Sequence, residues 1–226
     1  MPAPLTPRNP LPDLLERRHL SNLIRRYPVL ECCERELAQA VDILIAVYES
    51  GGKLLICGNG GSASDSEHIV GELMKSFMLP RPITETQANR LKEIAGGLGV
   101  DIAMRLQQGL AAISLTSQHA LITAVANDIQ GNMIFAQQVQ GLGKTGDALL
   151  GISTSGNSAN VQNALITAKT LGMTTIALTG RSGGKILPWV DVAIRVPEDH
   201  VAEIQELHLP VYHYLCMALE WHFFGR

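Results

Sequence analysis

The sequence has few aromatic residues, no excess of basic charge and no long apolar run. Aromatic side chains make up 4% of the 226 residues, and the formal net charge is −3. A nucleic-acid-binding surface needs clustered basic residues, and the one dense basic stretch, residues 17–26, has the pattern of a solvated helix face. No apolar run reaches the roughly 18 residues of a membrane span. We therefore expect neither a nucleic-acid nor a membrane partner.

The four cysteines, Cys32, Cys33, Cys57 and Cys216, lack the spacing of a metal site or a disulfide framework. The proline-rich start, MPAPLTPRNPLP, lacks the apolar segment of a secretory signal. We interpret the cysteines as reduced, small apolar side chains. This pattern favours a cytoplasmic protein in which residues 1–12 are extended or disordered.

What the sequence does contain is enough apolar surface for a large core, at 46% hydrophobic residues. Residues 13–50 have helical periodicity and form a predicted arm of two helices split at Pro28. From there on, apolar stretches alternate with helical ones, and a long helix with a possible kink at Pro210 ends the chain. The apolar stretches are LLIC, AAISL, DALLGIS, TTIALT and VDVAIRV.

These five stretches are continuously apolar, which is typical of strands that are buried on both faces. The alternation therefore predicts an α/β fold, a doubly wound five-stranded parallel sheet flanked by helices, in a single domain over residues 13–226. Residues 78–110 interrupt the pattern. We expect a loop over 78–92 and a weak helix over 93–110, broken by Gly96, Gly97 and Gly99. This insert is either a lid or extra wall over the site, or a surface elaboration or oligomer contact.

Ligands of such sheets bind beyond the carboxyl ends of the strands, and two polar stretches lie there. CGNGGS follows the first strand, and its glycines let backbone N–H groups approach a ligand. It matches neither the dinucleotide fingerprint nor the P-loop. A helix follows, with Ser62 or Ser64 as the expected N-cap.

The second stretch, STSGNSAN, follows the third strand at the start of a helix. It contains four hydroxyl side chains, those of Ser153, Thr154, Ser155 and Ser158, and no basic residue. A helix N-terminus favours an anion, and hydroxyls add donors. A single serine would suffice as an N-cap, so the stretch predicts a phosphomonoester site.

Two helices carry further candidates. His68 and Glu72 are four residues apart, so both project from one side of a helix directly after the glycine turn. On the last helix, His208 lies about 60° and His213 about 80° round from Gln205. Spacing alone does not choose between the two histidines, and an isolated histidine on a helix is usually structural.

Taken in order, GNGGSASDSEHIVGEL, AND, LLGISTSGNSANV and IQELHLPVYH resemble the SIS (sugar isomerase) domain family, and within it the phosphoheptose isomerases. The resemblance covers about residues 27–224, apart from the insert. It implies an aldose–ketose isomerase that converts sedoheptulose 7-phosphate to D-glycero-D-manno-heptose 7-phosphate through an enediol or enediolate. It also implies a homotetramer with sites near the subunit interfaces.

The resemblance implies a role for each matching position. Glu72 and His213 correspond to the catalytic acid/base pair. His68, Glu72, Gln205 and His213 correspond to the ligands of one Zn²⁺ ion per subunit, which leaves His208 a structural role. The implied substrate-binding residues are Asn59, Gly60, Gly61, Ser62, Asn127, Asp128, Ser153, Thr154, Ser155, Ser158 and Gln205.

Other members of the same family remain alternatives. One is a different sugar-phosphate enzyme, such as a hexulose- or arabinose-phosphate isomerase or an N-acetylmuramic-acid phosphate etherase. Another is a non-catalytic SIS protein that binds a phosphosugar or a replication-initiation partner. The presence of both Glu72 and His213 favours an enzyme.

Overall fold

A computed structural model of the chain describes residues 19–225. The expectations for residues 1–12 and for the start of the arm at residue 13 lie outside this range. Residues 19–26 are helical, a 3₁₀-helix η1 covers Pro28–Cys33, and α2 covers Glu34–Glu49. Pro28 opens η1, where its missing N–H removes no helical hydrogen bond. The predicted split of the arm at this proline is confirmed.

The sheet has five parallel strands in the order β2-β1-β3-β4-β5, which confirms the predicted fold class. β1 lies between β2 and β3, so the strand order reverses beside it, at the point where such sheets bind ligands. The strands are β1 (Leu54–Gly58), β2 (Ala112–Ser114), β3 (Ala148–Ser153), β4 (Thr174–Thr179) and β5 (Val192–Arg195).

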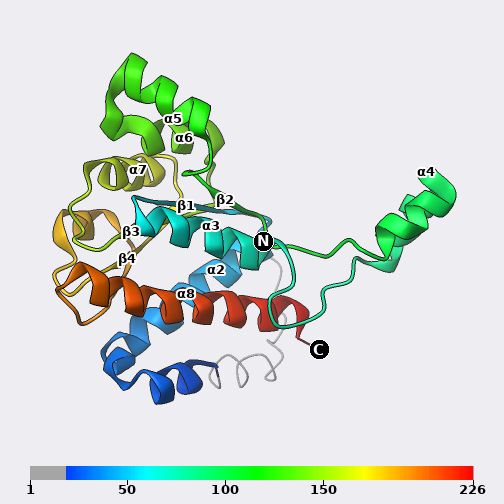
Figure 1. Cartoon of the computed structure of the whole chain (residues 1–226), viewed down its shortest axis with the longest axis horizontal. Coiled ribbons are helices and arrows are strands. Elements are labelled where there is room, and N and C mark those ends of the chain that lie inside the picture. The colour runs from blue at the N-terminus through cyan, green and yellow to red at the C-terminus, as the bar shows by residue number, and fades with distance from the viewer. Residues whose placement is uncertain (1–18, 226) are drawn as a thin grey trace, which may run out of the picture.

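Helices cover both faces of the sheet, as Figure 1 shows. Leu54 and Ile56 of β1 point into a core that includes α2, α3 and α8. Leu55 and Cys57 point into a second core with α6 and α7. The remaining helical segments are α3 (Gly61–Met74), α4 (Glu85–Ala103), α5 (His119–Val125), η2 (Ala126–Gln130), η3 (Gly131–Met133), α6 (Ile134–Leu142), α7 (Ala159–Thr170), η4 (Gly184–Trp189) and α8 (Val201–Phe224).

One detail of the helices differs from the expectations. The N-cap of α3 is Gly60, at φ 57° and ψ −121°, so neither Ser62 nor Ser64 caps the helix. A residue with a side chain is strained at that φ, so a glycine caps this helix, two residues before the nearer of the predicted caps, Ser62. The predicted long last helix is confirmed: α8 covers Val201–Phe224, with Pro210 inside it.

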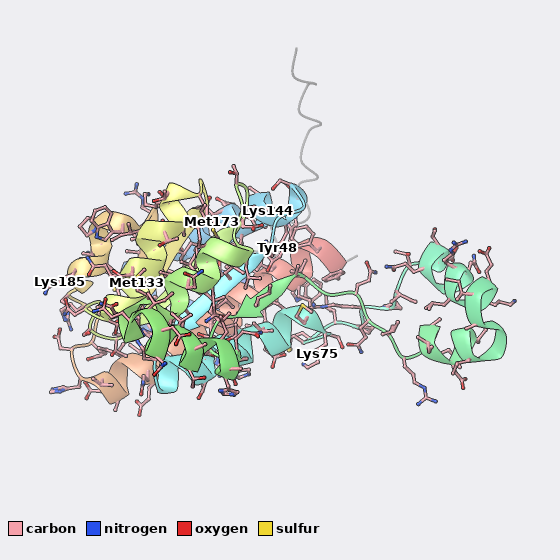
Figure 2. All side chains as sticks on the ribbon, turned by 90° about the horizontal axis from the view of Figure 1, so that it is seen from above. Tyr48, Lys75, Met133, Lys144, Met173 and Lys185 are labelled. Atoms are coloured by element: carbon pink, nitrogen blue, oxygen red, sulfur yellow. The ribbon has the colours of Figure 1, made fainter. Side chains whose placement is uncertain are left out.

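The insert, residues 78–110, projects from the body of the molecule. Both views show α4 apart from the other helices, joined by two extended segments (Figures 1 and 2). The expected loop over 78–92 is wrong from Glu85 onward, because Thr84 and Gln87 form a capping box that starts the helix. Gly96, at φ 56°, bends α4 into two pieces. α4 lies apart from the sheet and from the helices that cover it (Figures 1 and 2).

Two further observations concern the composition. None of the helices within residues 19–225 combines the length and apolar character that a bilayer crossing requires. All four cysteines are free thiols, and Cys33, Cys57 and Cys216 are buried, in agreement with their interpretation as small apolar side chains.

Candidate active site

The glycine turn lies at the carboxyl end of β1, and the hydroxyl loop lies at the carboxyl end of the neighbouring strand β3. A reciprocal pair of amide hydrogen bonds joins them: Asn59 donates to Asn160 at 2.9 Å, and Asn160 donates back at 2.8 Å. Both side chains are at the surface. The two predicted ligand-binding segments therefore form one continuous edge.

Gly61 allows the last helix to approach this edge. A Cβ atom built at Gly61 would lie 2.6 Å from Nε2 of Gln205, so any larger residue would displace the amide. Gln205 thus lies at the first turn of α3. His68 is seven residues further along α3, which corresponds to about 10 Å of helix.

The hydroxyl loop does not use its serines as an ordinary helix cap. Ser158 occupies the N-cap position of α7, but its side chain makes no capping hydrogen bond within the described chain. Its hydroxyl lies 3.1 Å from the hydroxyl of Ser153 instead. The Ser155 hydroxyl accepts from the N–H of Asn157 at 3.2 Å. The N–H of Val161 in the first turn of α7 donates to the side chain of Asn160 at 3.0 Å. The N–H groups before it at this positive helix end are available to an anion.

Among the described residues, one basic side chain lines the cavity beside the hydroxyl loop, and it is already paired. Arg181 lines a cavity of about 150 Å³ beside Thr154 and Ser155, but its guanidinium donates to Asp199 at 2.9 Å. Gly156 closes the loop with φ 64°, and a Cβ there would lie 1.9 Å from the carbonyl oxygen of Gly183. The loop therefore offers neutral hydroxyl and N–H donors.

The helix faces bring three of the predicted residues together. Nε2 of His68 lies 3.2 Å from Oε1 of Glu72, whose side chain is only 14% exposed. Oε2 of Glu72 accepts from Lys75 at 3.1 Å. The His213 ring lies edge-on to the His68 ring, with centroids 5.1 Å apart. Carboxylate and imidazoles thus form one cluster between α3 and α8.

The structure distinguishes the two histidines of α8. His213 is half-buried in the cluster, and its Nε2 is buried with no hydrogen-bond partner among residues 19–225. Burial and the neighbouring His68 lower the pKa of His213, while Glu72 opposes the shift. His208 is completely buried, beside Thr179 of β4, and burial lowers its pKa to about 4. Only His213 faces the cluster.

Sequence reasoning missed three side chains that surround this cluster. The Tyr212 hydroxyl lies 3.0 Å from Nδ1 of His68. Asp65 is hydrogen-bonded to Tyr212, and burial raises the pKa of its carboxyl group. Phe77 packs against His213 with ring centroids 5.5 Å apart. Asp65 lies one turn before His68, and Tyr212 is adjacent to His213, so their spacing was the available signal.

The remaining predicted residues are placed differently. Ser62 is buried in the first turn of α3, where its carbonyl accepts from the Ser66 hydroxyl at 2.8 Å. Asn127 and Asp128 lie in η2, both exposed, with the Asn127 amide donating to Asp128 at 2.9 Å. No hydrogen bond within residues 19–225 joins these two to the glycine turn or the hydroxyl loop.

The predicted zinc ligands fit the ion by donor type. Imidazole and carboxylate are common zinc ligands, and the unpartnered Nε2 of His213 is available to a metal. However, no group of three His, Cys, Asp or Glu side chains in residues 19–225 is arranged as a ready metal site. His68 and Glu72 contact each other, and the Gln205 amide lies against Gly61.

Comparison with known proteins identifies the family. The SIS domain model matches residues 21–93 and 90–180. A phosphoheptose isomerase of Helicobacter pylori strain P12 is 41% identical over 211 residues, which is 93% of this chain and 96% of the relative. The chain is a member of the phosphoheptose isomerase family of SIS-domain proteins.

Further relatives of this phosphoheptose isomerase family member cover most of both chains. The phosphoheptose isomerase of Methylibium petroleiphilum is 38% identical over 219 residues, 96% of each chain. The solved structure of the Francisella tularensis enzyme has a TM-score of 0.71 at 33% identity and covers 94% of this chain and 98% of its own. The Neisseria gonorrhoeae structure has a TM-score of 0.69 at 35% identity, covering 92% and 98%.

Proposed function

We propose that the protein is an aldose–ketose isomerase that converts sedoheptulose 7-phosphate to D-glycero-D-manno-heptose 7-phosphate. The observation that carries the proposal is the cluster of Glu72 with His68 and His213 beside the edge formed by the glycine turn and the hydroxyl loop. The edge suits a phosphate held by neutral donors. The names of relatives about 40% identical support the choice of a heptose phosphate.

The reaction moves a proton between C1 and C2 of the sugar phosphate. The carboxylate of Glu72 takes the proton from one carbon and returns it to the other. His213, kept neutral by its lowered pKa, exchanges a proton with the sugar oxygen. Lys75 and His68 hold the two carboxylate oxygens of Glu72, which orients the base before substrate arrives.

We include one Zn²⁺ ion per subunit in the proposal, held by His68, Glu72, His213 and Gln205. Such an ion would polarise the substrate carbonyl and stabilise negative charge on the enediolate oxygens. The donor types and the free nitrogen of His213 support this assignment. A loaded site would require Gln205 to leave its present position against Gly61.

We further propose a cytoplasmic homotetramer with sites near its subunit interfaces. The insert supports the assembly, because its apolar side chains are uncovered in the single chain: Ile94 is 71% exposed, Leu98 66% and Met104 70%. Exposed apolar surface of this kind marks protein–protein contacts. Light scattering should give four times the chain mass, and Leu98→Asp should lower it. A monomeric wild type would reject the assembly.

The function itself is tested by incubating the purified protein with sedoheptulose 7-phosphate, with and without added Zn²⁺, and following the anomeric protons by NMR. New aldoheptose signals are the expected result, and a dependence on zinc would support the metal assignment. Absence of turnover, while the sugar phosphate still raises the unfolding temperature, would reject the isomerase and leave a phosphosugar-binding protein.

A further inference from the structure

The segment that connects α3 to α4 is held by a buried ion pair. The side chains of Arg81 and Glu220 are both 0% exposed, and Nε of Arg81 donates to Oε1 of Glu220 at 2.7 Å. Buried charges are tolerated when further hydrogen bonds satisfy them. Neither side chain reaches solvent, so neither contacts the substrate.

Glu220 binds the backbone of the segment that packs against His213. Its carboxylate accepts from the N–H groups of Phe77 at 2.8 Å, Met78 at 2.7 Å and Leu79 at 3.2 Å. Phe77 packs against the ring of His213. Glu220 follows His213 by seven residues, two turns along the same side of α8. One carboxylate therefore ties Phe77 to the helix that presents His213.

Arg81 binds the C-terminal end of α3, the helix that carries Glu72. Nη1 donates to the carbonyl of Leu73 at 2.8 Å, and Nη2 donates to the carbonyl of Glu72 at 3.1 Å. α3 ends at Met74, so the last carbonyls lack helical N–H partners, and a cation there is favourable. One of the two carbonyls belongs to the proposed catalytic base.

We propose that Arg81 and Glu220 are positioning residues that set the carboxylate of Glu72 relative to the imidazole of His213. The inference rests on the proposed isomerase function, because it assigns the pair a part in that reaction. The planar guanidinium binds two carbonyls of α3 and one carboxylate of α8 at once, which fixes the end of one helix against the other. A misplacement of about 1 Å at a reacting group can lower the rate about 100-fold.

A second buried carboxylate provides a matched control. Asp147 is also 0% exposed and accepts from the side chain of Lys53 and from the N–H groups of Lys53 and Lys144. It directly precedes β3, at the end of the sheet opposite the proposed site. Asp147→Asn and Glu220→Gln therefore remove the same charge from equally buried carboxylates, and only the pair of Glu220 contacts the cluster.

The experiment compares Arg81→Lys, Glu220→Gln and Asp147→Asn for unfolding temperature, kcat and KM. Arg81→Lys keeps the positive charge but loses the planar guanidinium that binds two carbonyls and one carboxylate at once. We expect all three to lower the unfolding temperature. Arg81→Lys and Glu220→Gln should also lower kcat at least tenfold with KM changed less than threefold, whereas Asp147→Asn should keep kcat within twofold.

Two outcomes would overturn the positioning role. One is an Arg81→Lys enzyme with kcat within twofold of wild type. The other is an Asp147→Asn enzyme that loses as much kcat at an equal loss of unfolding temperature. A wild type without turnover rejects the isomerase instead. In that case amide hydrogen exchange tests the positioning role. Arg81→Lys should accelerate exchange in residues 69–79 but not in β1. Exchange in residues 69–79 as slow as in wild type would overturn the positioning role.

Discussion

The two halves of the proposed site are built by different means. The loop half, at the ends of β1 and β3, consists of glycines, hydroxyls and N–H groups within two short segments that one amide pair joins. The helix half, with Glu72 and His213, exists only because α3 packs beside α8. Its members are more than 130 residues apart in sequence. We infer that the loop half binds the substrate and the helix half performs the chemistry.

The largest expected effect separates the two halves most directly. Glu72→Gln keeps the shape of the side chain and removes the base, so kcat should fall by about 10²- to 10⁴-fold. The unfolding temperature should still rise on addition of sedoheptulose 7-phosphate, because the loop half is intact. Kinetics and thermal unfolding measure the two quantities. Unchanged activity would remove Glu72 from the mechanism.

The second effect concerns the histidine of α8 that faces away from the site. The pKa of His208 is about 4 in the folded protein, against about 6.5 in an unfolded chain. Between these values the unfolded state takes up a proton that the folded state does not, so the free energy of unfolding falls as the pH falls. The loss should approach about 3 kcal/mol near pH 4.

Urea unfolding at pH 7.5, 6 and 5 measures this loss, and His208→Leu is the comparison. The variant should lose less stability than wild type over that range and keep kcat within about twofold, since position 208 lies outside the cluster. An equal loss in both proteins would show that other groups cause the pH dependence. A large loss of kcat would place His208 in the helix half.

The same division marks what the sequence could predict. The five strands, their parallel direction and the hydroxyl loop follow from local patterns, and all appear in the structure. The helix half did not follow, because a spacing of three or eight residues from Gln205 leaves both histidines of α8 as candidates. Only the packing of α8 against α3 and β4 places His213 in the cluster and His208 in the core.

Partners distant in sequence were missed for the same reason. Glu220 and Arg81 are unremarkable charges in the sequence, and their burial depends on where the segment after α3 lies. The start of the helix in the insert was placed at residue 93 rather than at Glu85, although Thr84 and Gln87 carry the capping-box pattern. There the local signal was present, and the glycines that follow it in the sequence concealed it.

The third effect tests the loop half. Ser155→Ala removes a hydroxyl that the proposal assigns to the phosphate, and a hydrogen bond to a charged group contributes about 1.5–3 kcal/mol. KM should therefore rise about tenfold or more, with kcat changed less than about twofold. Sedoheptulose without the phosphate is the control, because its weak turnover should be the same in wild type and in Ser155→Ala. A fall in kcat alone would contradict the division of roles.

The smallest effect lies where the loops meet. Asn160 holds Asn59 through two exposed hydrogen bonds, and exposed bonds contribute little, so Asn160→Ala should change kcat and KM by about threefold or less. Asn160→Asp retains an acceptor for Asn59 and for the N–H of Val161 but brings a negative charge toward the phosphate site. If the loop half only binds, the aspartate should raise KM more than the alanine and leave kcat unchanged. A larger loss of kcat in Asn160→Ala would mean that the amide pair also aligns the sugar with Glu72, and the two halves would then not be independent.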